Sequence, residues 1–255
     1  MIDPIVCRPS RSVESLGILT ERMIALNRRQ LIGTSAALAS AFVVGRYVAR
    51  AGDAYPFTLG VASGEPTHDG FVLWTRLAPM PLAPDGLGGM SKPVSVTWDV
   101  ATDDAMRNVV RTGIAEASSR FAHSVHVEVD GLEPGRPYWY RFTALGQQSP
   151  VGRTKTDPAP NARPQRMRFA FASCSDWQMG YFSAYRHITE ENPDLVIFLG
   201  DYIYERTLTG AGADADRIVR KHDGPTAADP ASYRNRYALY RTDPVCRRCT
   251  GRCRA

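Results

Sequence analysis

The spacing of apolar residues changes once along this chain, at a Pro-rich segment over residues 157–165. From about residue 57 to 156, apolar and polar residues alternate, and turn residues interrupt the pattern. Beyond the Pro-rich segment, apolar residues form nearly continuous runs. Alternation is typical of strands with one buried face, whereas continuous runs are typical of strands covered on both faces. The sequence therefore predicts a multi-domain β plus α/β protein, with a β-sandwich over 56–157 and a partial α/β domain over 166–244.

Several short segments of the first region favour β-strands. They are Phe71–Arg76, Val94–Val100, Ser124–Val129 and Arg136–Ala144. Turn signals such as Asp69-Gly70 and Asp130-Gly131 lie between them. Short strands at this spacing are typical of a β-sandwich.

The turn before the last of these strands carries the most specific local signal. Leu132-Glu133-Pro134-Gly135 leads into the Tyr-rich run Tyr138-Trp139-Tyr140. This combination resembles the corner of fibronectin-type-III-like modules, and the resemblance implies a sandwich of that kind. We interpret the aromatic residues of the region as core packing, with stacking on a carbohydrate or a partner as the alternative.

The second region predicts a strand, a short helix and a second strand. The strand segments are Met167–Ala172 and Asp194–Leu199, and the helical run covers about Phe182 to Glu191. Both strand segments are almost continuously apolar, which predicts that they are buried. A strand–helix–strand unit predicts parallel strands.

The N-terminal 51 residues are interpreted as an extension and a twin-arginine signal peptide. Arg28 and Arg29 precede a short, weakly apolar stretch over 31–44, and Ala49-Arg50-Ala51 supplies a small-x-small cleavage site. A membrane span needs about 20 strongly apolar residues, so this stretch fits a signal better than an anchor. We expect periplasmic or secreted localisation, the twin-arginine translocase as an export partner, and no permanent membrane anchor.

Positive charge is concentrated at the two ends of the chain. The formal net charge is +5, yet residues 52–245 carry 23 acidic against 20 basic side chains. A sequence of this kind predicts no broad basic surface, so nucleic acid is not expected as a stable partner.

Three polar residues follow the two predicted parallel strands. Cys174 comes directly after the first strand, Asp201 follows the second, and Tyr204 lies three positions further on. Because the carboxyl ends of parallel strands meet at one edge of a sheet, we expect these side chains to converge. A thiolate, a carboxylate and a phenolate would form an anionic nest for a cation. Taken alone, Cys174 is more typical of a buried apolar thiol, and Asp201 is also consistent with a loop cap.

Taken together, the motifs around these residues resemble those of PhoD-type alkaline phosphatases. The likeness is clearest in Phe171-Ala172-Ser173-Cys174 and in Leu199-Gly200-Asp201-Tyr202-Ile203-Tyr204-Glu205. Weaker likeness appears upstream, in 59–66 and 72–76, and downstream over 233–244. The resemblance implies that Cys174 and Tyr204 ligate iron (Fe3+), that Asp201 bridges iron and calcium, and that phosphate monoesters or diesters are hydrolysed outside the cytoplasm.

The last residues depart from this pattern. Residues 245–255 contain three Cys and four Arg, a composition that we expect to suit neither a strand nor a helix. We interpret them as an aberrant tail produced by a frameshift or an early stop, with a zinc site as a minor alternative. The likeness is expected to end after Pro244.

Two hypotheses about the function are alternatives to a phosphatase. The chain could be a non-catalytic exported β-sandwich fragment with an inactive partial catalytic domain. It could also be a redox protein that uses Cys174, although no resolving Cys lies nearby in the predicted body.

Overall fold

The computed structural model describes residues 54–210 and 216–252. The predicted signal segment with Arg28 and Arg29, and the last residues of the tail, lie outside the described residues. The strands of the first half are β1 (Val61–Gly64), β2 (Phe71–Arg76), β3 (Val94–Ala101), β4 (Val109–Ala117), β5 (Ser124–Val129), β6 (Pro137–Ala144), β7 (Gln147–Gln148) and β8 (Gly152–Lys155). The second half contains β9 (Phe169–Ala172), α2 (Ser183–Glu191), β10 (Leu195–Phe198), α3 (Pro230–Thr242) and α4 (Pro244–Arg252).

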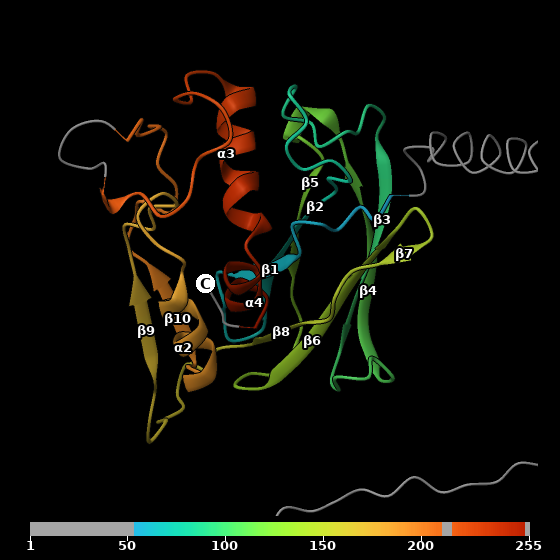
Figure 1. Cartoon of the computed structure of the whole chain (residues 1–255). Helices are drawn as coiled ribbons and strands as arrows, with labels where there is room; N and C mark the ends of the chain where they lie inside the picture. Colours follow the sequence, from blue (N-terminus) through green and yellow to red (C-terminus); the bar gives the residue numbers. More distant parts are fainter. Residues whose placement is uncertain (1–53, 211–215, 253–255) are drawn as a thin grey trace, which may run out of the picture. The chain divides into compact units, whose positions relative to one another are not determined.

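The strands of the first half form two antiparallel sheets (Figure 1). One sheet has the order β1-β2-β5, and the other has the order β4-β3-β6-β7 with β8 also paired to β6. A single apolar core contains Phe71 and Leu73 from the first sheet together with Val96, Tyr140 and Phe142 from the second. The alternating burial of β6 is the direct result of its alternating sequence.

The strand predictions for the first half are confirmed at β2, β3, β5 and β6. The sequence analysis missed β1, β4, β7 and β8. Strand β4 pairs only with β3, and most of its side chains are exposed, so its sequence lacks the apolar alternation of a half-buried strand.

The strand–helix–strand prediction is also confirmed. β9 and β10 pair in parallel, with Phe171 opposite Ile197, and α2 lies between them in the sequence. One face of this sheet packs in an apolar cluster with α2, through Ala170, Ala172 and Val196.

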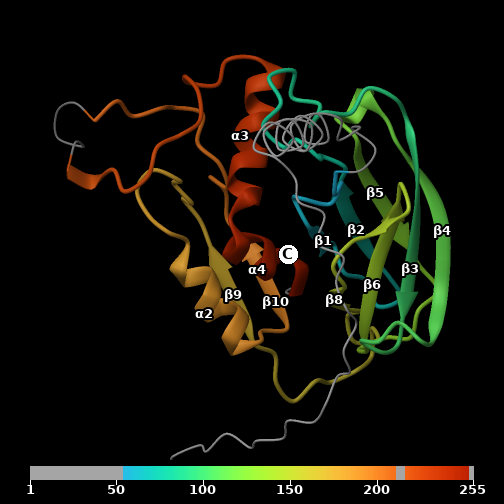
Figure 2. The same cartoon turned by 45° about the vertical axis from the view of Figure 1, so that its right-hand side comes forward.

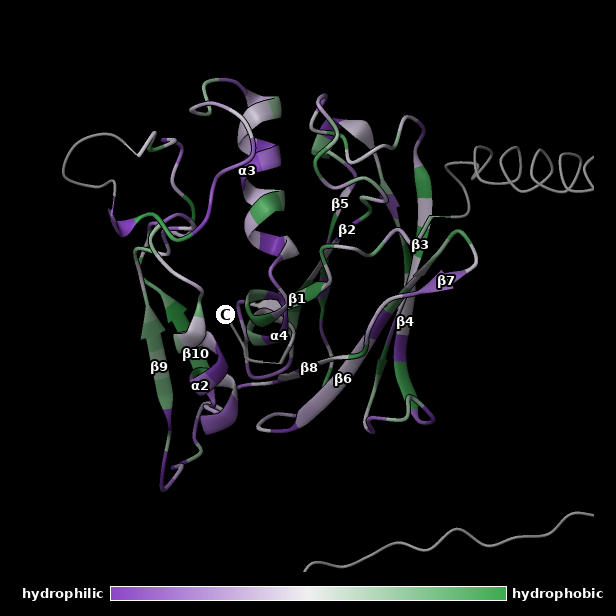
Figure 3. Cartoon of the chain, viewed as in Figure 1, coloured by the Kyte–Doolittle hydropathy of each residue, from purple (hydrophilic) through white to green (hydrophobic). Residues whose placement is uncertain are grey.

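The prediction that both strands are buried is wrong, because β9 has no buried residue and β10 has only Val196. Phe169 is 61% exposed and Phe171 is 65% exposed. Ile197 on the neighbouring strand is also exposed, and both strands are apolar in sequence (Figure 3). Within the described residues, helix α2 covers one face of this sheet and nothing comparable covers the other.

The expectation that residues 245–255 suit neither a strand nor a helix is wrong, because residues 244–252 form α4. Pro244 occupies the first turn, and the Asp243 carboxylate accepts hydrogen bonds from the Val245 and Cys246 backbone N–H groups at 2.9 and 3.2 Å. Cys246, Cys249 and Thr250 are buried at helical spacing. The composition is unusual, yet the spacing of its apolar side chains is that of an amphipathic helix.

The two antiparallel sheets of the first half are called the β-domain below. A buried arginine joins helix α3 to it. Arg241 is 1% exposed, and its guanidinium donates to the Leu59 carbonyl oxygen at 2.9 and 3.2 Å and to the Val61 carbonyl oxygen at 3.3 Å. It also donates to the Thr250 hydroxyl of α4 and lies 5.0 Å from the centroid of the Trp74 ring. A cation from α3 thus holds the carbonyl groups of Val61 in β1 and of Leu59 just before it. Figure 2 shows α3 and α4 beside the strands of the first half.

Replacing Arg241 with Met keeps an apolar stem but leaves the buried Leu59 oxygen without either donor. An unsatisfied buried polar group costs ~1–3 kcal/mol, and two carbonyl groups are affected, so we expect the free energy of unfolding to fall by about 2–4 kcal/mol. Urea denaturation followed by far-UV circular dichroism measures this. Arg186→Met, at an exposed position of α2, is the control and should change stability by less than ~0.5 kcal/mol. Equal urea midpoints for the two variants would contradict the assigned role.

Candidate metal centre

The chain turns sharply after β9 and after β10, and the candidate ligands occupy these turns. Cys174 and Asp201 have φ angles of 54° and 50°, in the left-handed region that non-glycine residues rarely adopt. Gly200, with φ 112°, precedes Asp201. The Cys174 N–H donates to the Gly200 carbonyl oxygen at 3.3 Å, and the Ser175 N–H donates to the Asp201 carbonyl oxygen at 2.9 Å. These two bonds extend the pairing of the parallel strands into the turns.

The three candidate side chains meet at the edge that the topology predicted. The Tyr204 hydroxyl donates to Asp201 Oδ2 at 3.1 Å, and the Cys174 Sγ lies 3.6 Å from the same oxygen. Cys174 and Asp201 are exposed, and Tyr204 is half-buried. A cation at this point could therefore be reached from solvent.

The surroundings of Tyr204 favour its protonated form. The hydrogen bond with Cys174 raises the pKa of Tyr204 well above its usual range, and partial burial and the Asp201 carboxylate raise it further. A bound cation would reverse this preference, because a thiol and a phenol bind a metal in their deprotonated forms. The donor set of one sulfur and two oxygens therefore fits a metal ion. Among residues 54–210 and 216–252, no group of three or more His, Cys, Asp or Glu side chains could hold a metal, so the group depends on Tyr204 as its third member.

A cavity of about 350 Å³ adjoins the group. Cys174 and Ser175 form one part of its wall, and Phe171, Met179, Phe182 and Ile188 form an apolar part. The cavity is large enough for an organic group of modest size beside the candidate ligands.

Two family models match this chain. Residues 39–158 match the model described as "PhoD-like phosphatase, N-terminal domain", and residues 169–254 match the model described as "PhoD-like phosphatase". The chain belongs to the PhoD-like phosphatase family. The second match continues through α4, so the likeness does not end after Pro244 as predicted.

Individual relatives agree with this family. The chain is 48% identical over 219 residues to "Alkaline phosphatase D" of Bacillus subtilis (strain 168), a match that covers 84% of this chain and 37% of the relative. A solved structure described as "Structure of PhoD" superimposes with a TM-score of 0.74 at 48% identity, over 78% of this chain and 38% of that one. "Purple acid phosphatase 23" of Arabidopsis thaliana is 31% identical over 105 residues, or 39% of this chain and 22% of the relative. The chain thus spans less than two fifths of the length of each relative.

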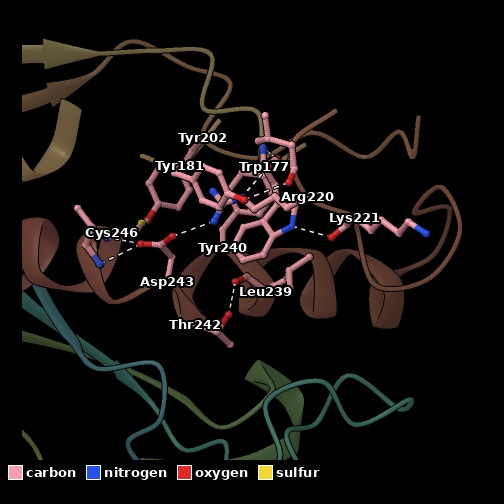
Figure 4. Close-up of polar contacts among 12 residues, drawn as sticks. Trp177, Tyr181, Tyr202, Arg220, Lys221, Leu239, Tyr240, Thr242, Asp243 and Cys246 are labelled. Carbon is pink, nitrogen blue, oxygen red and sulfur yellow. Dashed lines mark hydrogen bonds and ion pairs between the residues drawn. The ribbon is translucent and has the colours of Figure 1, made fainter. Parts of the chain in front are cut away.

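Tyr240 of α3 holds the two site-bearing turns of this PhoD-like chain together (Figure 4). Its hydroxyl oxygen accepts a hydrogen bond from the Trp177 N–H at 3.0 Å, next to which it lies in Figure 4. It also accepts a hydrogen bond from the Tyr204 N–H at 3.3 Å. Trp177 lies three residues after Cys174, and Tyr204 is itself a candidate ligand. The phenol of one helix residue therefore fixes the backbone on both sides of the candidate centre.

Sequence reasoning missed a second bridge in the same region. Arg220 stacks 3.6 Å above the centroid of the Trp177 ring and pairs with Asp243 at 2.9 Å (Figure 4). The Trp177 indole N–H donates to the Lys221 carbonyl oxygen at 2.8 Å. The described part of the segment over 206–230 therefore packs against Trp177 through Arg220 and Lys221. The contact joins positions 43 residues apart, and no local sequence pattern signals such a pair.

The two histidines of this half are poor candidates for acid catalysis at the centre. His187 is exposed on α2 and lies 3.2 Å from Glu190. His222 is buried against the ring of Tyr240. Burial lowers the pKa of His222 to about 4, and the charge of Arg236 adds to this effect, which Asp176 partly opposes.

The neutral His222 ring predicts a loss of stability in mild acid. His222 takes up a proton below pH 6.5 in the unfolded chain but only below about pH 4 in the folded chain. The free energy of unfolding therefore falls as the pH drops from 6.5 to 4, and His222 causes no further fall below pH 4. The fall attributable to His222 should be about 2–3 kcal/mol. Urea denaturation of His222→Phe at pH 7 and pH 4.5 should show a smaller fall than the unchanged chain. His187→Phe should keep the full acid sensitivity, and an equal fall in both variants would refute this assignment.

Proposed function

We propose that this chain forms part of an exported, metal-dependent phosphatase that hydrolyses phosphate monoesters or diesters. The observation that carries the proposal is the convergence of Cys174 and Tyr204 on a single carboxylate oxygen of Asp201. Membership of a family of phosphatases supports the reaction class. The chain spans 37% of the length of its Bacillus relative. Hydrolysis by this chain is therefore part of the proposal.

The proposed architecture is a fibronectin-III-like β-sandwich over 56–157 followed by a partial α/β metallophosphatase sheet over 166–244. The two antiparallel sheets with a common core support the first part. The parallel pair β9 and β10 with α2 between them in sequence supports the second. In α/β proteins, ligands bind outside the carboxyl ends of the strands, which is where the candidate ligands lie.

The proposed metals are iron (Fe3+), held by Cys174, Asp201 and Tyr204, and calcium, which shares the Asp201 carboxylate. Phenolate and carboxylate oxygens suit Fe3+, and carboxylate oxygens suit calcium. Two such ions would supply Lewis-acid stabilisation of the phosphoryl oxygens.

The chain's own residues have defined roles in this proposal. Asp201 presents one oxygen to both neighbours, and Cys174 and Tyr204 each give up a proton when the site is loaded. The Tyr240 hydroxyl positions Tyr204 by accepting a hydrogen bond from the Tyr204 backbone N–H. The apolar wall formed by Met179, Phe182 and Ile188 would take the organic part of the ester and exclude water from it.

Metal content separates this proposal from its alternatives. The chain is purified, exchanged into a chelator, and titrated with Fe3+ and Ca2+ while the metals bound and the hydrolysis of 4-nitrophenyl phosphate and bis(4-nitrophenyl) phosphate are measured. Cys174→Ser, Asp201→Asn and Tyr204→Phe should each weaken iron binding by about tenfold or more, because each removes a ligand. Tyr181→Phe, at an exposed tyrosine outside the ligand set, is the matched control.

The results distinguish the metal-dependent phosphatase from the inactive fragment and from the redox protein. If the Tyr204→Phe and Cys174→Ser variants bind iron as tightly as the control, the ligand assignment is wrong. A chain that binds no iron and hydrolyses neither ester would be the inactive fragment. Loss of activity in Cys174→Ser with metal still bound would favour the hypothesis of a redox protein that uses Cys174.

Export by the twin-arginine translocase is the second part of the proposal. It depends on Arg28 and Arg29 ahead of a weakly apolar stretch. No helix within the described residues is long and apolar enough to cross a membrane. Replacing both arginines with Lys should keep the chain in the cytoplasm in cell fractionation, whereas Arg8→Lys/Arg11→Lys should not. Export of the first variant at the normal level would exclude this route.

A further inference from the structure

A second cavity lies at the opposite end of the parallel sheet from the candidate metal centre. Its volume is about 320 Å³, and its walls come from β8, from the segment before β9 and from the residues after α2. The charged side chains that line it are Arg153, Lys155, Arg166, Arg168 and Asp194. No motif of the sequence analysis includes this cavity.

The charge of the cavity contrasts with that of the rest of the folded chain. Four cationic side chains and a single carboxylate line it, whereas residues 52–245 as a whole carry more acidic than basic side chains. Cations drawn together in a concave site raise the local concentration of anions. The chemistry of the wall therefore selects a negatively charged ligand.

Several of these cations are held in fixed positions. Arg153 Nη1 donates to Asn192 Oδ1 at 2.7 Å, and Arg168 Nη2 donates to the Asn192 carbonyl oxygen at 3.2 Å. Lys155 Nζ lies 3.0 Å from Asp194 Oδ1, and the other oxygen of Asp194 accepts from the Arg168 backbone N–H at 3.0 Å. Asn192 ends α2 with a φ angle of 46°, and it contacts Arg153 through its side chain and Arg168 through its carbonyl oxygen. Cations held in this way lose less conformational entropy when a ligand binds.

The guanidinium groups point to the class of anion. An arginine has five N–H donors in a planar fork, and the bonds to Asn192 use one from each arginine. The fork matches two oxygens of a phosphate, to which it donates in pairs. Several arginines and one lysine around one cavity thus fit a tetrahedral oxyanion better than a single carboxylate.

The cavity is separate from the candidate metal centre. Arg168 directly precedes β9, and Cys174 follows the strand by two residues. At ~3.3 Å per residue, strand geometry places about 15–20 Å between them. The segment before β9 and the turn after it lie at opposite ends of the strand (Figure 1).

We propose that this cavity is a binding site for a phosphoryl group, either free inorganic phosphate or the phosphoryl group of an organic ligand. Arg166 and Arg168 contact the oxyanion from the segment before β9, and Arg153 and Lys155 contact it from β8. Because the site lies away from Asp201, it binds its ligand whether or not the metal centre is loaded. The inference does not depend on the proposed phosphatase activity.

The test is isothermal titration of the metal-free chain with inorganic phosphate, in chelator and at constant ionic strength. Arg166→Ala/Arg168→Ala should weaken binding by about tenfold or more, because two charge-assisted contacts are lost. The matched control is Arg107→Ala/Arg120→Ala, which removes the same charge from exposed positions of the β-domain and should leave the affinity unchanged. The single variant Arg166→Ala, at an exposed side chain, guards against misfolding and should still bind more weakly than the control.

Two further measurements locate the site and identify the source of the ligand. Asp201→Asn should bind phosphate as tightly as the unchanged chain. If that variant loses binding, or if Arg166→Ala/Arg168→Ala binds as tightly as the control, the proposal is overturned. Tighter binding of phenyl phosphate than of inorganic phosphate would identify an organic ligand, and the reverse order would identify the free anion, with the phosphoryl site supported in both cases.

Discussion

Two consecutive residues of α3 connect the halves of this structure. The Tyr240 hydroxyl accepts the backbone N–H groups of Trp177 and Tyr204 beside the parallel sheet. The Arg241 guanidinium, one position further along, donates to the Leu59 and Val61 carbonyl oxygens of the β-domain. Adjacent residues of a helix point about 100° apart, so one turn of α3 can serve two neighbours at once. One turn of α3 therefore links the candidate centre to the β-domain.

The turns that carry the candidate ligands need this support. Positive φ angles at Cys174 and Asp201 cost of order 1–3 kcal/mol each and persist only where the surroundings determine them. The surroundings here are the strand pairing that continues into both turns and the Tyr240 hydroxyl behind them. Strain of this kind concentrates at functional sites, and its presence at both ligand-bearing strand ends agrees with the proposed role.

The sequence predicted the elements that depend on local spacing and on topology. The convergence of Cys174 and Asp201 follows from parallel pairing alone, whatever the surrounding side chains do. The exposure of Phe171 could not be predicted, because burial depends on which layers cover a sheet and a strand's sequence does not specify them. The stacking of Arg220 on Trp177 has no local signature. The composition of α4, rich in Cys and Arg, hides the helical spacing of its buried residues Cys246 and Cys249.

The hydrogen bonds on Asp201 describe what a cation would replace. The phenol proton of Tyr204 and the thiol proton of Cys174 both point at Asp201 Oδ2, so two protons occupy the space between three ligand atoms. The pKa of Tyr204 lies well above its usual range, because its hydrogen bonds with Cys174 and Asp201 and its partial burial favour the protonated phenol. A cation must displace them, which makes its affinity steeper with rising pH than that of a site built from carboxylates alone. Metal loading of the proposed centre is therefore expected to improve as the pH rises.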